Sequence, residues 1–213
     1  MKTDDLVAVL STNVEPVRRG LVGRSISIAV AGAVIVALGI TLAALGLRAD
    51  VTTTHATIFL LLKIAFALAV IGVAMRYLLR LARPGAERGV SPYSIMVPFA
   101  AIALLGAISL GTAPSSHWDS MILGDEWLEC LLSIPIIAIV PFAVVIFAVR
   151  RAAPTNLVRT GAAAGLVAGG VSAMAYAFHC TNDSAPFVAV WYVATIVLCT
   201  LAGAALGPRL LRW

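Results

Sequence analysis

The fold class of this chain is decided by residues 25–47, SISIAVAGAVIVALGITLAALGL. The stretch contains no charged residue, and it is as long as the roughly 20 apolar residues that a helix needs to cross a bilayer. Lipid offers no hydrogen-bond partner to a free backbone amide, so a stretch of this kind crosses as a helix. It follows about 25 more polar residues and is too long for the apolar core of a signal peptide. We therefore predict a retained transmembrane helix.

Five further stretches are also long and mostly apolar, and the composition agrees with them. The 213 residues are 61% hydrophobic and 12% charged, whereas soluble domains average roughly 45–50% apolar and about 25% charged residues. A soluble core of this size cannot hide so much apolar surface, but a bilayer can. We predict an all-α polytopic membrane protein with six transmembrane helices, at residues 25–47, 56–79, 92–113, 128–149, 157–179 and 185–208.

Positive charges predict which ends of the helices face the cytoplasm, because cytoplasmic loops carry an excess of lysine and arginine. With the N-terminus inside, the cytoplasmic segments hold all but two of the 15 Lys and Arg residues. The exceptions are Arg48, in a loop, and Lys63, within the second span. We predict that both termini lie in the cytoplasm and that the protein spans a bacterial inner membrane. The division is a cytoplasmic segment 1–24, a six-helix domain 25–208 and a cytoplasmic tail 209–213.

Acidic residues, histidines and two cysteines gather on the opposite, periplasmic side of this topology. An acidic rim of this kind attracts cations weakly and in a salt-dependent way. The residues on this side are Asp50, Asp119, Asp125, Glu126, Glu129, Asp183, His55, His117, His179, Cys130 and Cys180.

Some of these residues also have ordinary interpretations. We expect His55 to cap the start of the second span and His117 to be a solvated loop residue. Cys199, deep in the sixth span, is expected to fill space between helices. For Lys63 two interpretations are open: its side chain extends outward to the membrane surface, or it is a buried functional lysine.

Cys130 and Cys180 lie at one depth, at the outer ends of two spans that a short loop joins. A disulfide needs Cα atoms within about 7 Å, and the periplasm is oxidising. Three interpretations are open: a structural disulfide, a sensor that changes redox state or binds metal, and inert apolar filler. We favour the sensor because histidines and acids surround the cysteines. Cys130, Cys180 and His179 would then bind a zinc-like or cadmium-like ion transiently, and no obligatory cofactor is expected.

A short amphipathic helix is predicted near the N-terminus, where acids meet the positive end of the helix dipole. An isolated helix under about 12–15 residues is marginal in water, so this one needs a partner surface. That surface is either the membrane interface or a cytoplasmic protein on which the segment folds. The residues that would contact such a protein are Asp4, Asp5, Leu6, Val7 and Leu10.

Small residues recur at every fourth position in the fifth and sixth spans, and they allow helix backbones to approach closely in lipid. Packing within one chain and homodimerisation are both open, and the first is favoured. The glycines are Gly161, Gly165, Gly169, Gly203 and Gly207.

Several stretches together resemble one known family over the whole length, the NrsF-type membrane anti-sigma factors of proteobacteria. The resemblance implies an inner-membrane negative regulator that holds an extracytoplasmic-function sigma factor until a stress arrives, typically heavy metal. The stretches are MKTDDLVAVLSTNVEPV at 1–17, RLARPG at 80–85, CLLSIP at 130–135, YAFHC at 176–180, APFVAVWY at 185–192 and GPRLLRW at 207–213.

The same resemblance implicates two cysteines in receiving the signal, and by motif these match Cys130 and Cys180. The HxxxCxxC motif of conventional zinc-binding anti-sigma domains is absent from the sequence, so residues 1–24 are the natural sigma-binding candidate, with the 80–91 loop as a second contributor. We expect no enzymatic activity, membrane lipid as a second partner, and no direct binding of nucleic acid, since no basic stripe alternates with aromatic residues.

Two rival functions are open. A small transporter or metal exporter would normally place paired ionisable residues near the membrane midplane, and we identify none in the spans. A membrane thiol oxidoreductase using Cys130 and Cys180 would usually need a second redox pair or a quinone site.

Overall fold

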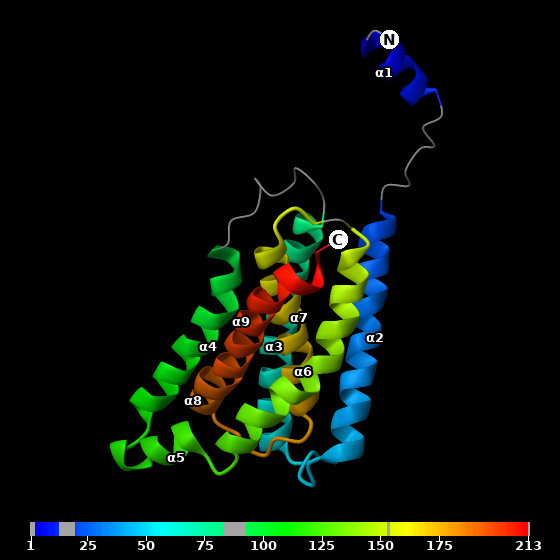
Figure 1. Ribbon diagram of the computed structural model, residues 1–213. Helices are drawn as coiled ribbons and strands as arrows, with labels where there is room; N and C mark the ends of the chain where they lie inside the picture. The colour runs from blue at the N-terminus through cyan, green and yellow to red at the C-terminus, as the bar shows by residue number, and fades with distance from the viewer. Residues whose placement is uncertain (1–2, 13–19, 83–92, 153, 213) are drawn as a thin grey trace.

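The computed structural model describes residues 3–12, 20–82, 93–152 and 154–212, and within them the chain forms helices and no strand. Six helical segments are long and apolar enough to cross a membrane, which confirms the predicted fold class. They are α2 (Leu21–Ala44), α3 (Thr54–Leu81), α4 (Tyr93–Thr112), the segment that ends in α6 (Trp127–Arg150), α7 (Leu157–Tyr176) and the segment Ala185–Leu210 (Figure 1). The first span begins at Leu21, four residues earlier than expected.

Helix α7 is the centre of the bundle. Every residue from Ala163 to Tyr176 is buried, and α7 packs against α2, α3, α6 and α9. Its sequence is rich in glycine and alanine, which suits a helix surrounded by other helices rather than by lipid. By contrast, large apolar side chains on the outer helices, such as Ile35 on α2 and Leu61 on α3, are well exposed and would face the lipid tails.

The glycine stripe holds α7 against α9 (Val193–Leu210). A Cβ atom added to Gly165 would overlap the carbonyl oxygen of Cys199, and one added to Gly203 would overlap that of Gly161. The two backbones are therefore in direct contact, and only glycine fits between them. Packing within one chain is confirmed for this stripe, and its surface is not available to a second copy.

Two features of the fold are absent from the sequence predictions. The loop before α6 folds into a short 3₁₀ turn, η2 (Ser115–His117), followed by the helix α5 (Trp118–Leu123). The last span is not one regular helix: a single turn, α8 (Ala185–Phe187), is followed by a π-helical turn, η3 (Val188–Tyr192), and then by α9. The two features are joined, since the Trp191 indole in η3 donates to the Ile122 carbonyl in α5.

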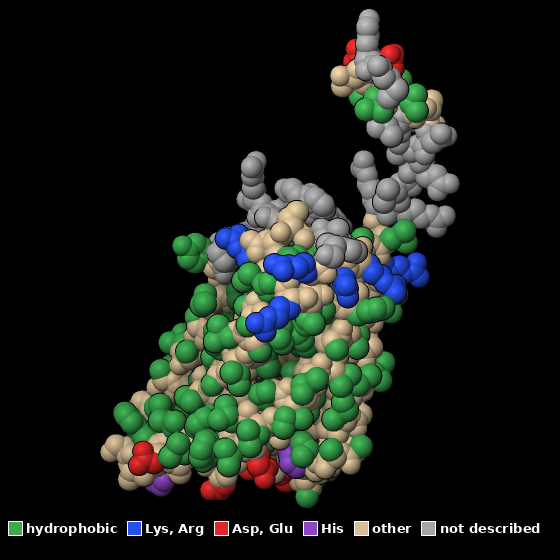
Figure 2. Space-filling model, in the orientation of Figure 1, with side chains coloured by type: hydrophobic (Ala, Val, Ile, Leu, Met, Phe, Trp, Pro, Cys, Tyr) green, Lys and Arg blue, Asp and Glu red, His purple; other side chains and the backbone are tan. Residues whose placement is uncertain are grey.

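Charges divide the bundle into two ends (Figure 2). The alternating helix directions bring arginines to one end, which we call the basic end, and acids and histidines to the other, the acidic end. Arginines at the basic end are Arg24, Arg76, Arg80, Arg150, Arg151, Arg159 and Arg209; the acidic end carries Asp50, Asp119, Asp125, Glu126, Glu129 and Asp183. This is the charge separation that the predicted topology requires, although the direction in which the bundle crosses a membrane is a separate matter.

The predicted N-terminal helix is α1 (Thr3–Ser11), with Asp4 and Asp5 in its first turn. In Figure 1 it lies beyond the basic end of the bundle. Leu6 and Val7 are 42% and 60% exposed, so their apolar side chains are available for contact with another surface.

The contact between α7 and α9 leads to a stability prediction. Gly165→Leu places a side chain where the α9 backbone lies, and overpacking of this kind costs about 1–3 kcal/mol or more. We expect a lower midpoint of thermal unfolding in detergent. The midpoint is measured by size-exclusion chromatography of samples heated to increasing temperatures. The matched control is Gly39→Leu in α2, because a Cβ atom at Gly39 meets nothing within 4 Å. Equal midpoints for the two variants would contradict the proposed role of the stripe.

Candidate functional site

Arg48 is the hub of a buried polar cluster at the acidic end of the bundle. Its side chain is fully buried and all five guanidinium N–H groups are used: one Nε–H, two on Nη1 and two on Nη2. Nε and Nη2 donate to the Asp50 carboxylate at 2.7 and 2.9 Å, while Nη1 and Nη2 donate to Asp183 at 2.9 and 2.6 Å. The second Nη1 hydrogen reaches the Cys180 carbonyl oxygen at 3.0 Å.

These bonds perturb the charged groups of the cluster in the expected directions. Hydrogen bonds that Arg48 donates to Asp50 and, with a smaller effect, to Asp183 raise the pKa of Arg48 above its ordinary value. The hydrogen bond from Arg48 lowers the pKa of Asp50 to about 2. Both groups therefore stay charged at any physiological pH, and Arg48 ties the α2–α3 loop to the segment between α7 and α8.

Lys63 is the second buried cation of the cluster. It lies nine residues into α3, or about 14 Å along the helix at 1.5 Å per residue. Its side chain has no exposed surface and turns toward the acidic end, where Nζ contacts the Cys180 carbonyl oxygen at 3.0 Å, Asp183 at 3.3 Å and the Cys180 sulfur at 3.6 Å. Lys63 is therefore buried, as one interpretation expects, and its ammonium also extends toward the outer end of the span, as the other expects; a functional role for it stays a prediction. Lys63 and Asp183 form an ion pair that the sequence did not reveal. This pair lies at the acidic end of the bundle and not at the midplane, where a transporter would normally place one.

Cys130 and Cys180 are both free thiols with no exposed surface. Both belong to one buried hydrophobic cluster, and α6, which carries Cys130, packs against α7, which Cys180 follows. Burial raises the pKa of Cys180, whereas the Lys63 ammonium opposes that rise. The buried Tyr192 hydroxyl lies near the Cys180 thiol and has no well-formed hydrogen bond within the described residues.

His179 does not join the two cysteines. Its Nδ1 lies 3.3 Å from the Gly46 carbonyl oxygen, and its ring lies against Tyr176 with centroids 5.8 Å apart. Among residues 3–12, 20–82, 93–152 and 154–212, no group of three or more His, Cys, Asp and Glu side chains is arranged to hold a metal ion. The expected set of Cys130, Cys180 and His179 does not form such a group among the described residues.

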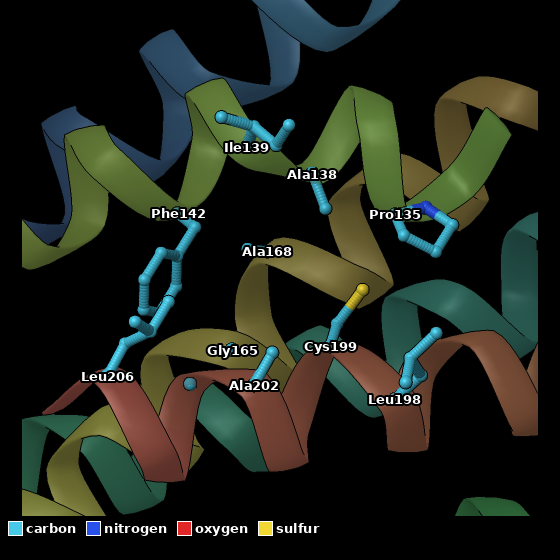
Figure 3. A pocket seen from close by; sticks show the side chains of 11 residues that line it. Pro135, Ala138, Ile139, Phe142, Gly165, Ala168, Leu198, Cys199, Ala202 and Leu206 are labelled. Atoms are coloured by element: carbon cyan, nitrogen blue, oxygen red, sulfur yellow. The ribbon is translucent and has the colours of Figure 1, made fainter. Parts of the chain in front are cut away.

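The other residues singled out in the sequence have structural surroundings. His55 does not cap α3: the cap is the Thr53 hydroxyl, which accepts from the Ala56 amide, while His55 Nδ1 lies 3.7 Å from Asp183. His117 is exposed, as expected. Cys199 lines an apolar cavity of about 180 Å³ between α6, α7 and α9, and no residue of the polar cluster lines this cavity (Figure 3).

The sigma-binding candidates on α1 lie beyond the basic end of the bundle, whereas the polar cluster is at the acidic end (Figure 1). Asp4, Asp5, Leu6 and Val7 are exposed on α1. Leu10 is within α1, but its side chain lies outside the described residues, as does most of the 80–91 loop.

The polar cluster predicts a strong effect of one carboxylate. Asp183→Asn leaves two buried cations short of a negative charge, and breaking a buried pair costs about 3–5 kcal/mol. Asp119→Asn is the matched control, since Asp119 is an exposed acid at the same end, and surface changes usually stay within about 0.5 kcal/mol. Tryptophan fluorescence during thermal unfolding in detergent measures the difference. Similar midpoints for the two variants would show that the cluster does not stabilise the fold.

Comparison with known proteins identifies the family. The chain matches the family model NrsF, described as negative regulator of sigma F, over residues 10–213. It is 30% identical over 213 residues, the whole of both chains, to a probable anti-sigma-F factor NrsF of Azospira oryzae. It is 33% identical over 135 residues, 63% of each chain, to the anti-sigma-F factor NrsF of Caulobacter vibrioides. No solved structure matches. On this similarity along its full length, the chain belongs to the NrsF family.

Proposed function

We propose that this protein is a membrane-bound anti-sigma factor that holds a sigma factor of the extracytoplasmic-function class and has no enzymatic activity of its own. The observation that carries the proposal is the family match over residues 10–213, together with full-length similarity to a protein named as a probable anti-sigma-F factor. The helical bundle adds support, because its described residues form six membrane-spanning segments and offer no large soluble domain.

The proposed topology places the basic end of the bundle in the cytoplasm and the acidic end in the periplasm of a bacterium. Positive charge near the ends of spans sets orientation, and the described arginines favour this direction. Both termini and the segment 1–24 then lie where a sigma factor is found, while the buried polar cluster lies on the side that meets external stress. The lipid bilayer is the second proposed partner, and its cytoplasmic face would meet the basic end of the protein.

The proposed sigma-binding element is α1. Its exposed Leu6 and Val7 can enter an apolar groove on the partner, and Asp4 and Asp5 can face basic residues beside that groove. A helix of nine residues is marginal alone, so part of the binding free energy would be used to order it. This explains why a short segment can hold sigma and also release it readily.

The proposed signal acts on Cys130 and Cys180. In exchange with a small disulfide, one cysteine sulfur bonds to one sulfur of the oxidant, and the other half of the oxidant leaves as a thiolate that takes up the proton. The second cysteine then attacks the sulfur of the first and breaks this mixed disulfide, so that the remaining half of the oxidant leaves as a second thiol. The pair loses two electrons and two protons, and the oxidant gains them. Cys130 is in α6, and Cys180 is in the segment that follows α7. A bond between the two sulfurs would therefore shift α6 relative to the end of α7.

Release follows only as far as the signal changes the relative stability of the sigma-holding and sigma-free states. A tenfold release of sigma needs about 1.4 kcal/mol, which is small compared with the several kcal/mol that a disulfide typically contributes. The coupling from the acidic to the basic end would run through α7, which spans the bundle and contacts most of it.

The role of α1 is tested by sigma retention during purification in detergent. We expect Leu6→Asp to reduce retention roughly tenfold, or about 1.4 kcal/mol, and deletion of residues 1–19 to abolish it while leaving α2 whole. Ala8→Asp introduces the same charge on the opposite side of the helix, given 3.6 residues per turn, and should retain sigma. Undiminished retention after the deletion would refute the assignment of α1.

The role of the cysteines is tested with a sigma-dependent reporter in cells exposed to a disulfide oxidant. Cys130→Ser and Cys180→Ser should each keep sigma repressed and lose the induced response, because neither can form the bond between the two sulfurs. Cys199→Ser is the control and should respond normally, since Cys199 lines an apolar cavity elsewhere. A normal response in both single variants would remove these cysteines from the mechanism.

A further inference from the structure

The two buried thiols have different surroundings. The Cys180 sulfur lies 3.6 Å from the Lys63 ammonium, and the Tyr192 hydroxyl is nearby. The Cys130 thiol has no side-chain hydrogen bond within the described part of the chain, and its backbone amide makes an ordinary helical bond to Glu126. One member of the pair therefore has a cation at its sulfur, and the other does not.

The position of the Lys63 ammonium is fixed by its contacts. Its three N–H groups match three acceptors: the Cys180 carbonyl oxygen, the Cys180 sulfur and the Asp183 carboxylate. The side chain is fully buried, so water does not screen its charge as it would at the surface. A cation fixed in such surroundings acts strongly on a neighbouring anion.

Three other charged residues lie around Cys180, and none of them places a positive charge at its sulfur as Lys63 does. Arg48 donates to the Cys180 carbonyl oxygen rather than to its sulfur. Asp183 is ion-paired with both Arg48 and Lys63, and Glu126, which bonds Thr181, opposes a negative charge at Cys180. Of these groups, only Lys63 places a positive atom at the sulfur itself.

From this geometry we infer that Cys180, and not Cys130, is the thiol that reacts first with an oxidant or a soft electrophile, and that Lys63 is the positioning residue that sets this order. The inference rests on the proposed sensing role of the two cysteines and deepens it. In exchange with a small disulfide, the Cys180 sulfur forms the mixed disulfide and the departing thiolate takes the proton. Cys130 then attacks the Cys180 sulfur and displaces the second thiolate.

The order of reaction can be measured on the purified full-length protein, without sigma. In a Cys199→Ser background, brief treatment with iodoacetamide followed by mass spectrometry gives the ratio of modified Cys180 to modified Cys130. We expect Cys180 to lead. Lys63→Met, which removes the charge but keeps the length of the side chain, should lower that ratio about tenfold, equivalent to about 1.4 kcal/mol. General loosening of the bundle would expose both cysteines and is recognised by a rise in both.

Phe66→Leu is the matched control, because Phe66 is also buried on α3 and less than one turn from Lys63, and the ratio should not change. Equal modification of the two cysteines in the parent protein, or Cys130 ahead of Cys180, would overturn the inference without any variant. An unchanged ratio in folded Lys63→Met would overturn the part assigned to Lys63. These outcomes are separate from the reporter test, which would refute the sensing role while leaving the labelling ratio as it is.

Discussion

Two buried cations share one carboxylate at the acidic end, and the arrangement of that end depends on this interaction. Arg48 and Lys63 have no exposed side-chain surface, and charges in such a place persist only when they are paired and hydrogen-bonded. Asp183 supplies the shared negative charge. Because the three residues come from the α2–α3 loop, α3 and the α7–α8 segment, their pairing joins three parts of the chain that periodicity alone would leave independent. Cys180 is held within this cluster by its carbonyl oxygen.

The glycine contact between α7 and α9 is the complementary constraint along the length of the bundle. It lets two backbones meet and makes α7 a buried rod surrounded by four helices. A rod of this kind carries a displacement from one end to the other because close-packed interiors yield little. The proposed signal would pass along this rod from the polar cluster at one end of α7 to the arginines at the other.

Much of the fold could be predicted from sequence, because apolar length and the distribution of arginine act locally. The six spans, the N-terminal helix and the packing of the glycines were all of this kind. The pairing of Arg48 and Lys63 with Asp183 was not, since Asp183 lies more than 100 residues away from both along the chain. The signal was nevertheless present: these two residues are the two exceptions in the charge pattern. The π-helical turn depends on tertiary packing that no short motif encodes. The same is true of the hydrogen-bond geometry that makes Thr53, and not His55, the cap of α3.

The burial of α7 has a consequence for biogenesis. Among the six spans it is the least apolar, since its glycines and alanines are selected for contact with neighbouring backbones rather than for solubility in lipid. Its main partner, α9, follows α7 in the chain and therefore leaves the ribosome after it. The central helix must wait at the translocon or against α2, α3 and α6 with one side uncovered, and that side is covered only when α9 arrives.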